Sequence, residues 1–165
     1  MSRIIVITGP VQSGKTTFLR NLFEGRKDVS GFLCPDVNVL RCFFDLNSKE
    51  LLEFEVPHAG GGLSLINIGK FAFRSDVFIK AKFIIEQSFN QPVSFFIIDE
   101  IGKLELKGQG LEPELFTMLN KRALADTTLI LVVRDYLLDD VIKRYNLSDA
   151  VVIYIENKEE ILNFC

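Results

Sequence analysis

The sequence has no excess of positive charge and no long apolar run. Its 19 Lys and Arg residues against 22 Asp and Glu residues give a formal net charge of -3. Proteins that bind a nucleic-acid backbone need a basic surface to neutralise phosphates, so we expect no nucleic-acid partner. No apolar run approaches the ~20 residues that a membrane-spanning helix needs, so we expect no membrane span. The apolar run after Met1-Ser2-Arg3 is too short for a secretory signal.

Cysteine and histidine are too few to suggest a metal centre built from them. The three cysteines, Cys34, Cys42 and Cys165, are odd in number, and their spacing matches no metal-binding pattern. We therefore expect reduced thiols and a cytoplasmic location. The single histidine, His58, lies beside the glycines at 60–62, which favours a loop position over a ligand role.

Apolar residues, in contrast, are abundant: they form 48% of the chain and include 15 phenylalanines. A chain of 165 residues suits one domain, and folding at this size buries roughly 70% of the unfolded surface. Strand-like and helix-like patterns alternate along it. We therefore predict a single domain over residues 1–165, with a three-layer α/β fold around a mainly parallel sheet.

An insertion interrupts this alternation. Residues 39–46 face residues 51–56 across a short polar turn, which predicts an inserted β-hairpin at about 37–57. The glycine-rich segment 57–63 is a candidate lid or linker. Residues 66–73 are predicted to form one further strand, and Ser75 is predicted to cap the helix that follows.

The most informative motif occupies residues 9–17, which fit the phosphate-loop (Walker A) pattern G-x-x-x-x-G-K-[ST] at every required position. A strand-like run precedes it and a helix-like run follows. Backbone N–H groups of such a loop converge on phosphate oxygens, and the helix adds its N-terminal partial charge. We expect Lys15 to reach the β- and γ-phosphates and Thr16 to hold Mg²⁺. The expected nucleotide-binding residues are Gly9, Pro10, Val11, Gln12, Ser13, Gly14, Lys15, Thr16 and Thr17.

Two acidic residues follow the nearly continuous apolar run 93–98, as in a Walker B strand. Ligands bind at the carboxyl ends of parallel strands, so we expect Asp99 to bind Mg²⁺ and Glu100 to orient or polarise an attacking water. Arg134 ends the apolar run 129–133 and would lie on the same edge. It is a candidate for stabilising charge on a γ-phosphate or for stacking on a base, and its alternative interpretation is an exposed arginine before a helix.

Together these segments resemble the THEP-type family of small P-loop nucleoside-triphosphatases, also called cancer-related nucleoside-triphosphatases. The resemblance implies a RecA-like or kinase-like core that slowly hydrolyses ATP, GTP and other nucleoside triphosphates with Mg²⁺. It implies that Lys15 and Thr16 contact phosphate and metal and that Asp99 and Glu100 form the acidic pair. The family's acidic-Val-Arg step after Gly31-Phe32 is missing, because this chain has Asn38 at the third position. The matching segments are residues 9–17, Gly31-Phe32, Gly69-Lys70-Phe71, residues 99–106 and Val132-Val133-Arg134.

Three functions fit these patterns. The first is Mg²⁺-dependent hydrolysis of nucleoside triphosphates, with water positioned by Glu100. The second is a nucleoside or nucleotide kinase, which would need an acceptor pocket and usually a lid with several arginines; between Gly102 and Asp135 the arginines are Arg122 and Arg134. The third is a slow, nucleotide-responsive binding module in which the hairpin and residues 57–63 move.

Overall fold

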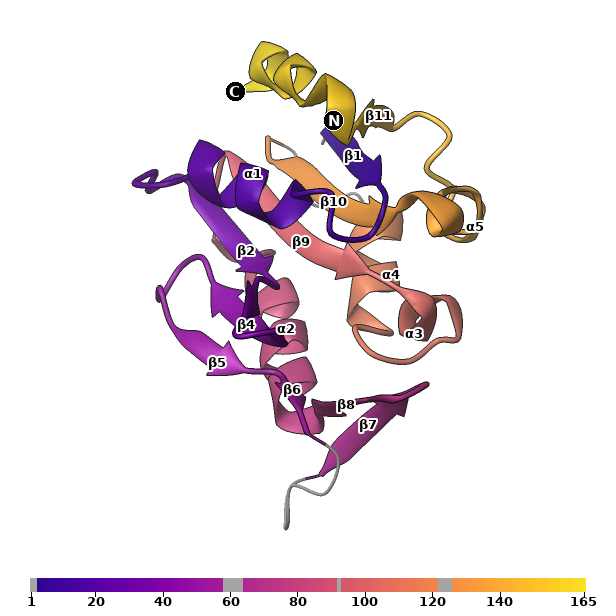
Figure 1. Cartoon of the computed structure of the whole chain (residues 1–165). Helices are drawn as coiled ribbons and strands as arrows, with labels where there is room; N and C mark the ends of the chain where they lie inside the picture. Colours follow the sequence, from indigo (N-terminus) through magenta and orange to yellow (C-terminus); the bar gives the residue numbers. More distant parts are fainter. Residues whose placement is uncertain (1–2, 58–63, 92, 122–125) are drawn as a thin grey trace.

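The computed structural model describes residues 3–57, 64–91, 93–121 and 126–165. Within these ranges an eight-stranded sheet has the order β11-β1-β10-β9-β2-β4-β3, with β5 paired to β4 (Figure 1). The mainly parallel α/β fold predicted from the sequence is confirmed. The mutually parallel strands are β1 (Arg3–Gly9), β2 (Val29–Leu33), β9 (Phe95–Ile101), β10 (Thr128–Arg134) and β11 (Val151–Tyr154). The antiparallel strands at one edge are β3 (Asp36–Val37), β4 (Leu40–Asp45) and β5 (Leu51–Glu53).

The parallel strands are apolar on both faces because both faces are covered. Successive side chains of a strand point to opposite faces, so Ile5 and Ile7 pack with Leu19 on one side, whereas Ile4 and Val6 pack on the other. Figure 1 shows helix α1 (Lys15–Leu22) crossing the front of the sheet, with α2 (Ser75–Gln87) and α4 (Glu114–Lys121) behind it. The 3₁₀ segment η2 (Ile155–Phe164) covers the front face, and α5 (Leu138–Arg144), which follows the 3₁₀ turn η1 (Asp135–Leu137), covers the back.

The strand order brings three carboxyl ends to one edge of the sheet. β10 lies between β1 and β9, and all three run in the same direction. Gly9 at the end of β1 is in register with Arg134 at the end of β10. Val132 of β10 is in register with Asp99 of β9. The phosphate loop, the acidic pair and Arg134 therefore emerge at the same edge.

The predicted hairpin exists, but its second arm is divided. β4 and β5 pair with Phe43 opposite Leu52, as the alternating pattern suggests. The prediction of one continuous arm over residues 51–56 is wrong, because the ladder with β4 stops at Glu53. The strand β6 (Glu55–Val56) then joins a second sheet, in the order β6-β8-β7, at the bottom of the view in Figure 1.

The predicted single strand at 66–73 is also wrong. It is a tight hairpin of β7 (Leu65–Ile68) and β8 (Phe71–Arg74), and the chain reverses at Gly69, whose φ is 59°. A positive φ suits glycine, so this residue marks a turn rather than a strand interior. Ser75 does not cap α2 with its side chain: Arg74 is the N-cap residue, and the Ser75 hydroxyl donates to the Ser64 carbonyl at 2.9 Å.

Two further segments connect the sheets to the helices. The polar stretch after Gly102 contains a short helix, α3 (Lys103–Leu106), whose buried Glu105 accepts hydrogen bonds from the backbone N–H groups of Gly102 and Leu111 at 2.8 and 3.0 Å. Of the candidate lid at 57–63, only Pro57 belongs to the described residues, and His58 also lies outside them. None of the described helices combines the length and apolar content that crossing a membrane requires.

Candidate active site

The phosphate loop wraps around the ammonium group of Lys15. Gly14 has a φ of 87°, a left-handed conformation that glycine adopts without strain, and the helix α1 begins at the next residue. The Lys15 Nζ donates to the carbonyl oxygens of Gly9 and Pro10 at 2.9 and 2.6 Å and to Ser13 Oγ at 3.2 Å. Burial lowers the pKa of Lys15, and the carboxylates of Glu100 and Asp99 oppose that shift.

The remaining loop residues lie at the surface of this cradle. Gly9 is buried and Ser13 and Thr16 are half-buried, whereas the other members of the motif face solvent: Pro10, Val11, Gln12, Gly14 and Thr17. A triphosphate lying on the loop would therefore meet accessible backbone at Gly14 and Thr17, at the start of the helix.

A hydrogen bond joins the two motifs that the sequence separates by 83 positions. The Thr16 hydroxyl donates to Asp99 Oδ2 at 2.6 Å, and the Cys34 backbone N–H donates to the same oxygen at 3.1 Å. Asp99 is only 2% exposed. Burial and the neighbouring Glu100 raise the pKa of Asp99 to about 6, against the lowering effect of the two hydrogen bonds.

These two side chains fit a magnesium ion. A hydroxyl and a carboxylate oxygen are the hard ligands that Mg²⁺ takes in proteins, usually one or two from the protein and the rest from phosphates and water. In the described part of the chain, no cluster of three or more His, Cys, Asp or Glu side chains could hold a metal by itself.

Glu100 leaves the regular strand ladder beside Asp99. Val132 pairs with Asp99 and Val133 with Ile101, so Glu100 is skipped in the register between β9 and β10. Such a bulge re-aims a side chain, and bulges are frequent next to active sites. The Glu100 Oε1 forms ion pairs with Arg41 Nη1 at 3.0 Å and with Arg134 Nη2 at 2.6 Å.

Arg134 lies at the edge where the sequence predicts it. In addition to its ion pair with Glu100, its Nη1 lies 3.4 Å from the hydroxyl of Tyr136. Burial lowers the pKa of Arg134, but the charges and hydrogen bonds of Glu100 and Tyr136 together outweigh this effect, so that the pKa is raised. The structure thus brings Lys15, Glu100 and Arg134 together, and the interpretation of Arg134 as merely an exposed residue before a helix is not supported.

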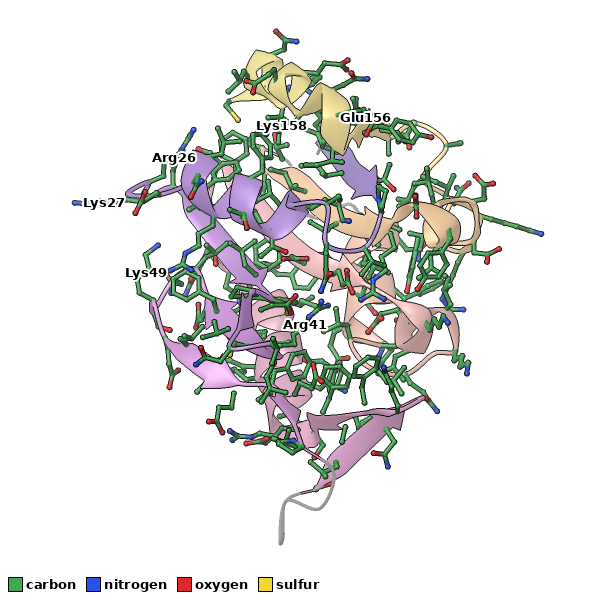
Figure 2. All side chains as sticks on the ribbon, in the orientation of Figure 1. Arg26, Lys27, Arg41, Lys49, Glu156 and Lys158 are labelled. Atoms are coloured by element: carbon green, nitrogen blue, oxygen red, sulfur yellow. The ribbon has the colours of Figure 1, made fainter. Side chains whose placement is uncertain are left out.

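Arg41 was not among the predicted site residues. Arg41 extends from β4 toward the middle of the molecule, whereas Lys27 and Lys49 project from the periphery of the molecule (Figure 2). Its Nε also donates to Asp36 at 3.2 Å. Burial opposes its charge, yet the carboxylates of Glu100 and Asp36 help to raise the pKa of Arg41. The available signal was a basic residue within an apolar strand, because a buried charge needs a partner.

Comparisons with known proteins agree with this architecture. No curated protein matches the chain significantly. The crystal structure of THEP1 from the hyperthermophile Aquifex aeolicus has a TM-score of 0.75 and 22% identity, over 97% of this chain and 95% of that one. The solution structure of a human cancer-related nucleoside triphosphatase has a TM-score of 0.66 and 21% identity, over 98% and 94% of the two chains. At these identities the likeness concerns the fold.

The family assignment comes from the sequence match. The model of the family described as NTPase matches residues 4–164 and so includes both the phosphate loop and the Asp99–Glu100 pair. Because this match spans almost the whole chain, the protein belongs to the NTPase family and is a P-loop nucleoside triphosphatase.

Proposed function

We propose that the protein hydrolyses ATP, GTP and other nucleoside triphosphates to the diphosphate and phosphate, with Mg²⁺ as cofactor and Glu100 positioning the attacking water. The observation that carries this proposal is the 2.6 Å contact between Thr16 and Asp99, which joins the phosphate loop to the acidic strand end. Phosphoryl transfer needs mainly positioning and charge stabilisation. Groups that can position the phosphates and groups that can stabilise charge both lie at this edge of the sheet.

Lys15 would hold the phosphates. Its three hydrogen bonds all go to oxygen acceptors of its own loop, at Gly9, Pro10 and Ser13. The β- and γ-phosphate oxygens of a triphosphate are charged acceptors and therefore bind an ammonium more strongly than neutral carbonyls do. The backbone N–H groups at the start of α1 would bind the same anion.

Thr16 and Asp99 would hold the magnesium ion together with phosphate oxygens. When bound, the ion neutralises charge that develops on the transferred group. The ion would also balance the negative charge of Asp99. This carboxylate is buried and its pKa is raised, so a nearby positive charge stabilises its ionised form.

Glu100 would orient the water, and the two arginines would stabilise the transferred phosphoryl group. Arg41 and Arg134 both contact the same Glu100 oxygen. A γ-phosphate brought to this position competes with the carboxylate for the guanidinium groups, which suit phosphate geometry. Once both guanidinium groups bind the phosphate, the Glu100 carboxylate would be free to accept a hydrogen bond from water. The bond from water to the γ-phosphorus would then form as the bond to the β–γ bridging oxygen breaks. The electron pair would stay on the diphosphate, and the proton of the water would pass to the Glu100 carboxylate.

The test is phosphate release from the four ribonucleoside triphosphates, with and without Mg²⁺ and with no other acceptor added. We expect Lys15→Ala and Glu100→Gln each to lower the rate by about 10²-fold or more. Lys27→Ala and Glu86→Gln are matched controls, since both side chains are exposed and lie away from the site. Equal turnover in the wild type and Lys15→Ala would overturn the proposal.

We also infer a cytoplasmic location. The three cysteines all belong to the described residues and are free, as expected of a reducing compartment.

A further inference from the structure

A cavity of about 540 Å³ opens beside the acidic pair, on the side away from the phosphate loop. Asp99, Glu100 and Arg134 form part of its wall, and the small sheet β6-β8-β7 forms another part. No residue of the loop 9–17, all of which is described, lines it. The phosphates of a nucleotide on the loop would therefore border this cavity without filling it.

The cavity is large enough for a second organic molecule. A water molecule takes up about 30 Å³ of liquid, whereas cavities of roughly 300–1,000 Å³ hold small organic molecules. The space beside the proposed water-positioning carboxylate therefore exceeds what a single water molecule requires.

The far end of the cavity is aromatic. Phe54 packs against Phe73 and Phe78 with ring centroids 5.0 and 4.9 Å apart, and Phe71 lies 6.5 Å from Phe73. Phe71 is 43% exposed, although the other described aromatic rings of this cluster are buried or half-buried. Lys70 Nζ lies over this ring, 5.3 Å from its centroid. A planar ligand such as a nucleobase would stack on the other face of the ring.

Cations and carboxylates both line the cavity. The cations include Arg41, Arg134, Lys103 and Lys107, and the carboxylates are Glu55, Asp99, Glu100 and Glu105. Neither of the two lysines forms an ion pair with a carboxylate among the described residues. Glu100, in contrast, is already paired with Arg41 and Arg134. The ammonium groups of Lys103 and Lys107 therefore suit a phosphate.

We propose that this cavity binds a nucleoside monophosphate, with its base at the aromatic end and its phosphate beside Glu100, as the acceptor of the γ-phosphoryl group. This inference rests on the proposed binding of a triphosphate to the loop and adds a second reaction to the hydrolysis. An oxygen of the monophosphate forms a bond to the γ-phosphorus while the bond to the β–γ bridging oxygen breaks. The electron pair of that bond stays on the departing diphosphate, the acceptor becomes a second diphosphate, and a dianionic acceptor has no proton to lose.

The test pairs each nucleoside monophosphate with a triphosphate that carries a different base, in the presence of Mg²⁺. Chromatography separates the two diphosphates, and free phosphate is measured in the same samples. We expect at least one monophosphate to become a diphosphate at about tenfold the rate of phosphate release. Phe71→Ala should raise the KM for that monophosphate about tenfold, since it removes the stacking ring. Phe83→Ala, an equally large truncation of a 57% exposed ring outside the cavity, should not.

The outcomes separate the two proposals. Phosphate release without any diphosphate formed from a monophosphate would overturn the acceptor assignment and leave the hydrolase intact. Loss of both products in the wild type would overturn both. Diphosphate formation with equal KM in Phe71→Ala and wild type would overturn the proposed position of the base.

Discussion

Replacing Asp99 with asparagine should stabilise the protein at neutral pH while it removes a proposed magnesium ligand. Asp99 is 2% exposed, and its pKa is raised from 3.8 to about 6, chiefly by burial and then by Glu100. The folded protein therefore binds a proton at Asp99 more tightly than the unfolded chain does. One pKa unit corresponds to about 1.4 kcal/mol, so this shift amounts to about 3 kcal/mol.

The sign of the effect follows from linkage. Because the pKa is higher in the folded state, the free energy of unfolding of the wild type falls as the pH rises from about 4 to about 6, and the loss is complete above that range. Asp99→Asn is neutral at every pH and keeps an oxygen for the Thr16 hydroxyl. Its free energy of unfolding should equal that of the wild type near pH 4 and exceed it by about 3 kcal/mol near pH 7.5.

The measurement is urea unfolding followed by circular dichroism across this pH range, with a chelator present in every sample. Asp139→Asn, a replacement of an exposed carboxylate on α5, is the control, and its curve should run parallel to that of the wild type. Parallel curves of unfolding free energy against pH for Asp99→Asn and the wild type would refute the reasoning. They would mean that burial does not destabilise the charged form of Asp99 in the folded protein.

Three other changes test different parts of the structure. Gly31→Ala should destabilise the protein by more than about 3 kcal/mol in urea unfolding, because its Cβ would lie 2.0 Å from the Ile97 carbonyl oxygen. Gly25→Ala, also at a positive φ but with open space around it, should lose only about 1–2 kcal/mol, and equal losses would contradict the argument. Arg41→Ala should lower kcat for phosphate release about 10²-fold, whereas Arg20→Ala, with an exposed side chain, should not; unchanged kcat in both would remove Arg41 from the site. Thr16→Val should raise the Mg²⁺ concentration needed for half-maximal turnover at least about tenfold while Thr16→Ser does not, and an unchanged requirement would remove this hydroxyl from the metal.

The sequence was most informative where local patterns determine geometry. The phosphate loop has its own signature, and the strand before it and helix after it supply the context that the signature requires. The strand residues 95–98 are all apolar because β9 is covered on both faces, and the acidic pair follows them at the carboxyl end of the strand. These two patterns are enough to predict that Thr16 and Asp99 share one edge of the sheet, although they do not reveal that β10 lies between the two strands.

The sequence was least informative about the insertion. The residues on both sides of Gly69-Lys70 are apolar, so the sequence pattern did not reveal the turn. Both strands, β7 and β8, are short, and apolar side chains of both pack against the core. Arg41 was missed for a related reason: its partner Glu100 is 59 positions away, and nothing in a local pattern indicates which distant carboxylate a buried guanidinium will meet. The cavity could not be predicted either, since its walls come from segments spread between Phe32 and Leu137.

Arg41 lies on β4, outside the phosphate loop and the acidic pair. Its strand, β4, pairs with β2 through Phe32 with Asp45 and Leu33 with Phe44, and the Leu46 N–H donates to the Gly31 carbonyl at 3.0 Å. Substitutions that shift this attachment would move a cation relative to Glu100 without altering any residue of the phosphate loop or the acidic pair. Under the role proposed for Arg41, such substitutions would change turnover from the antiparallel part of the sheet, in segments that a motif search passes over.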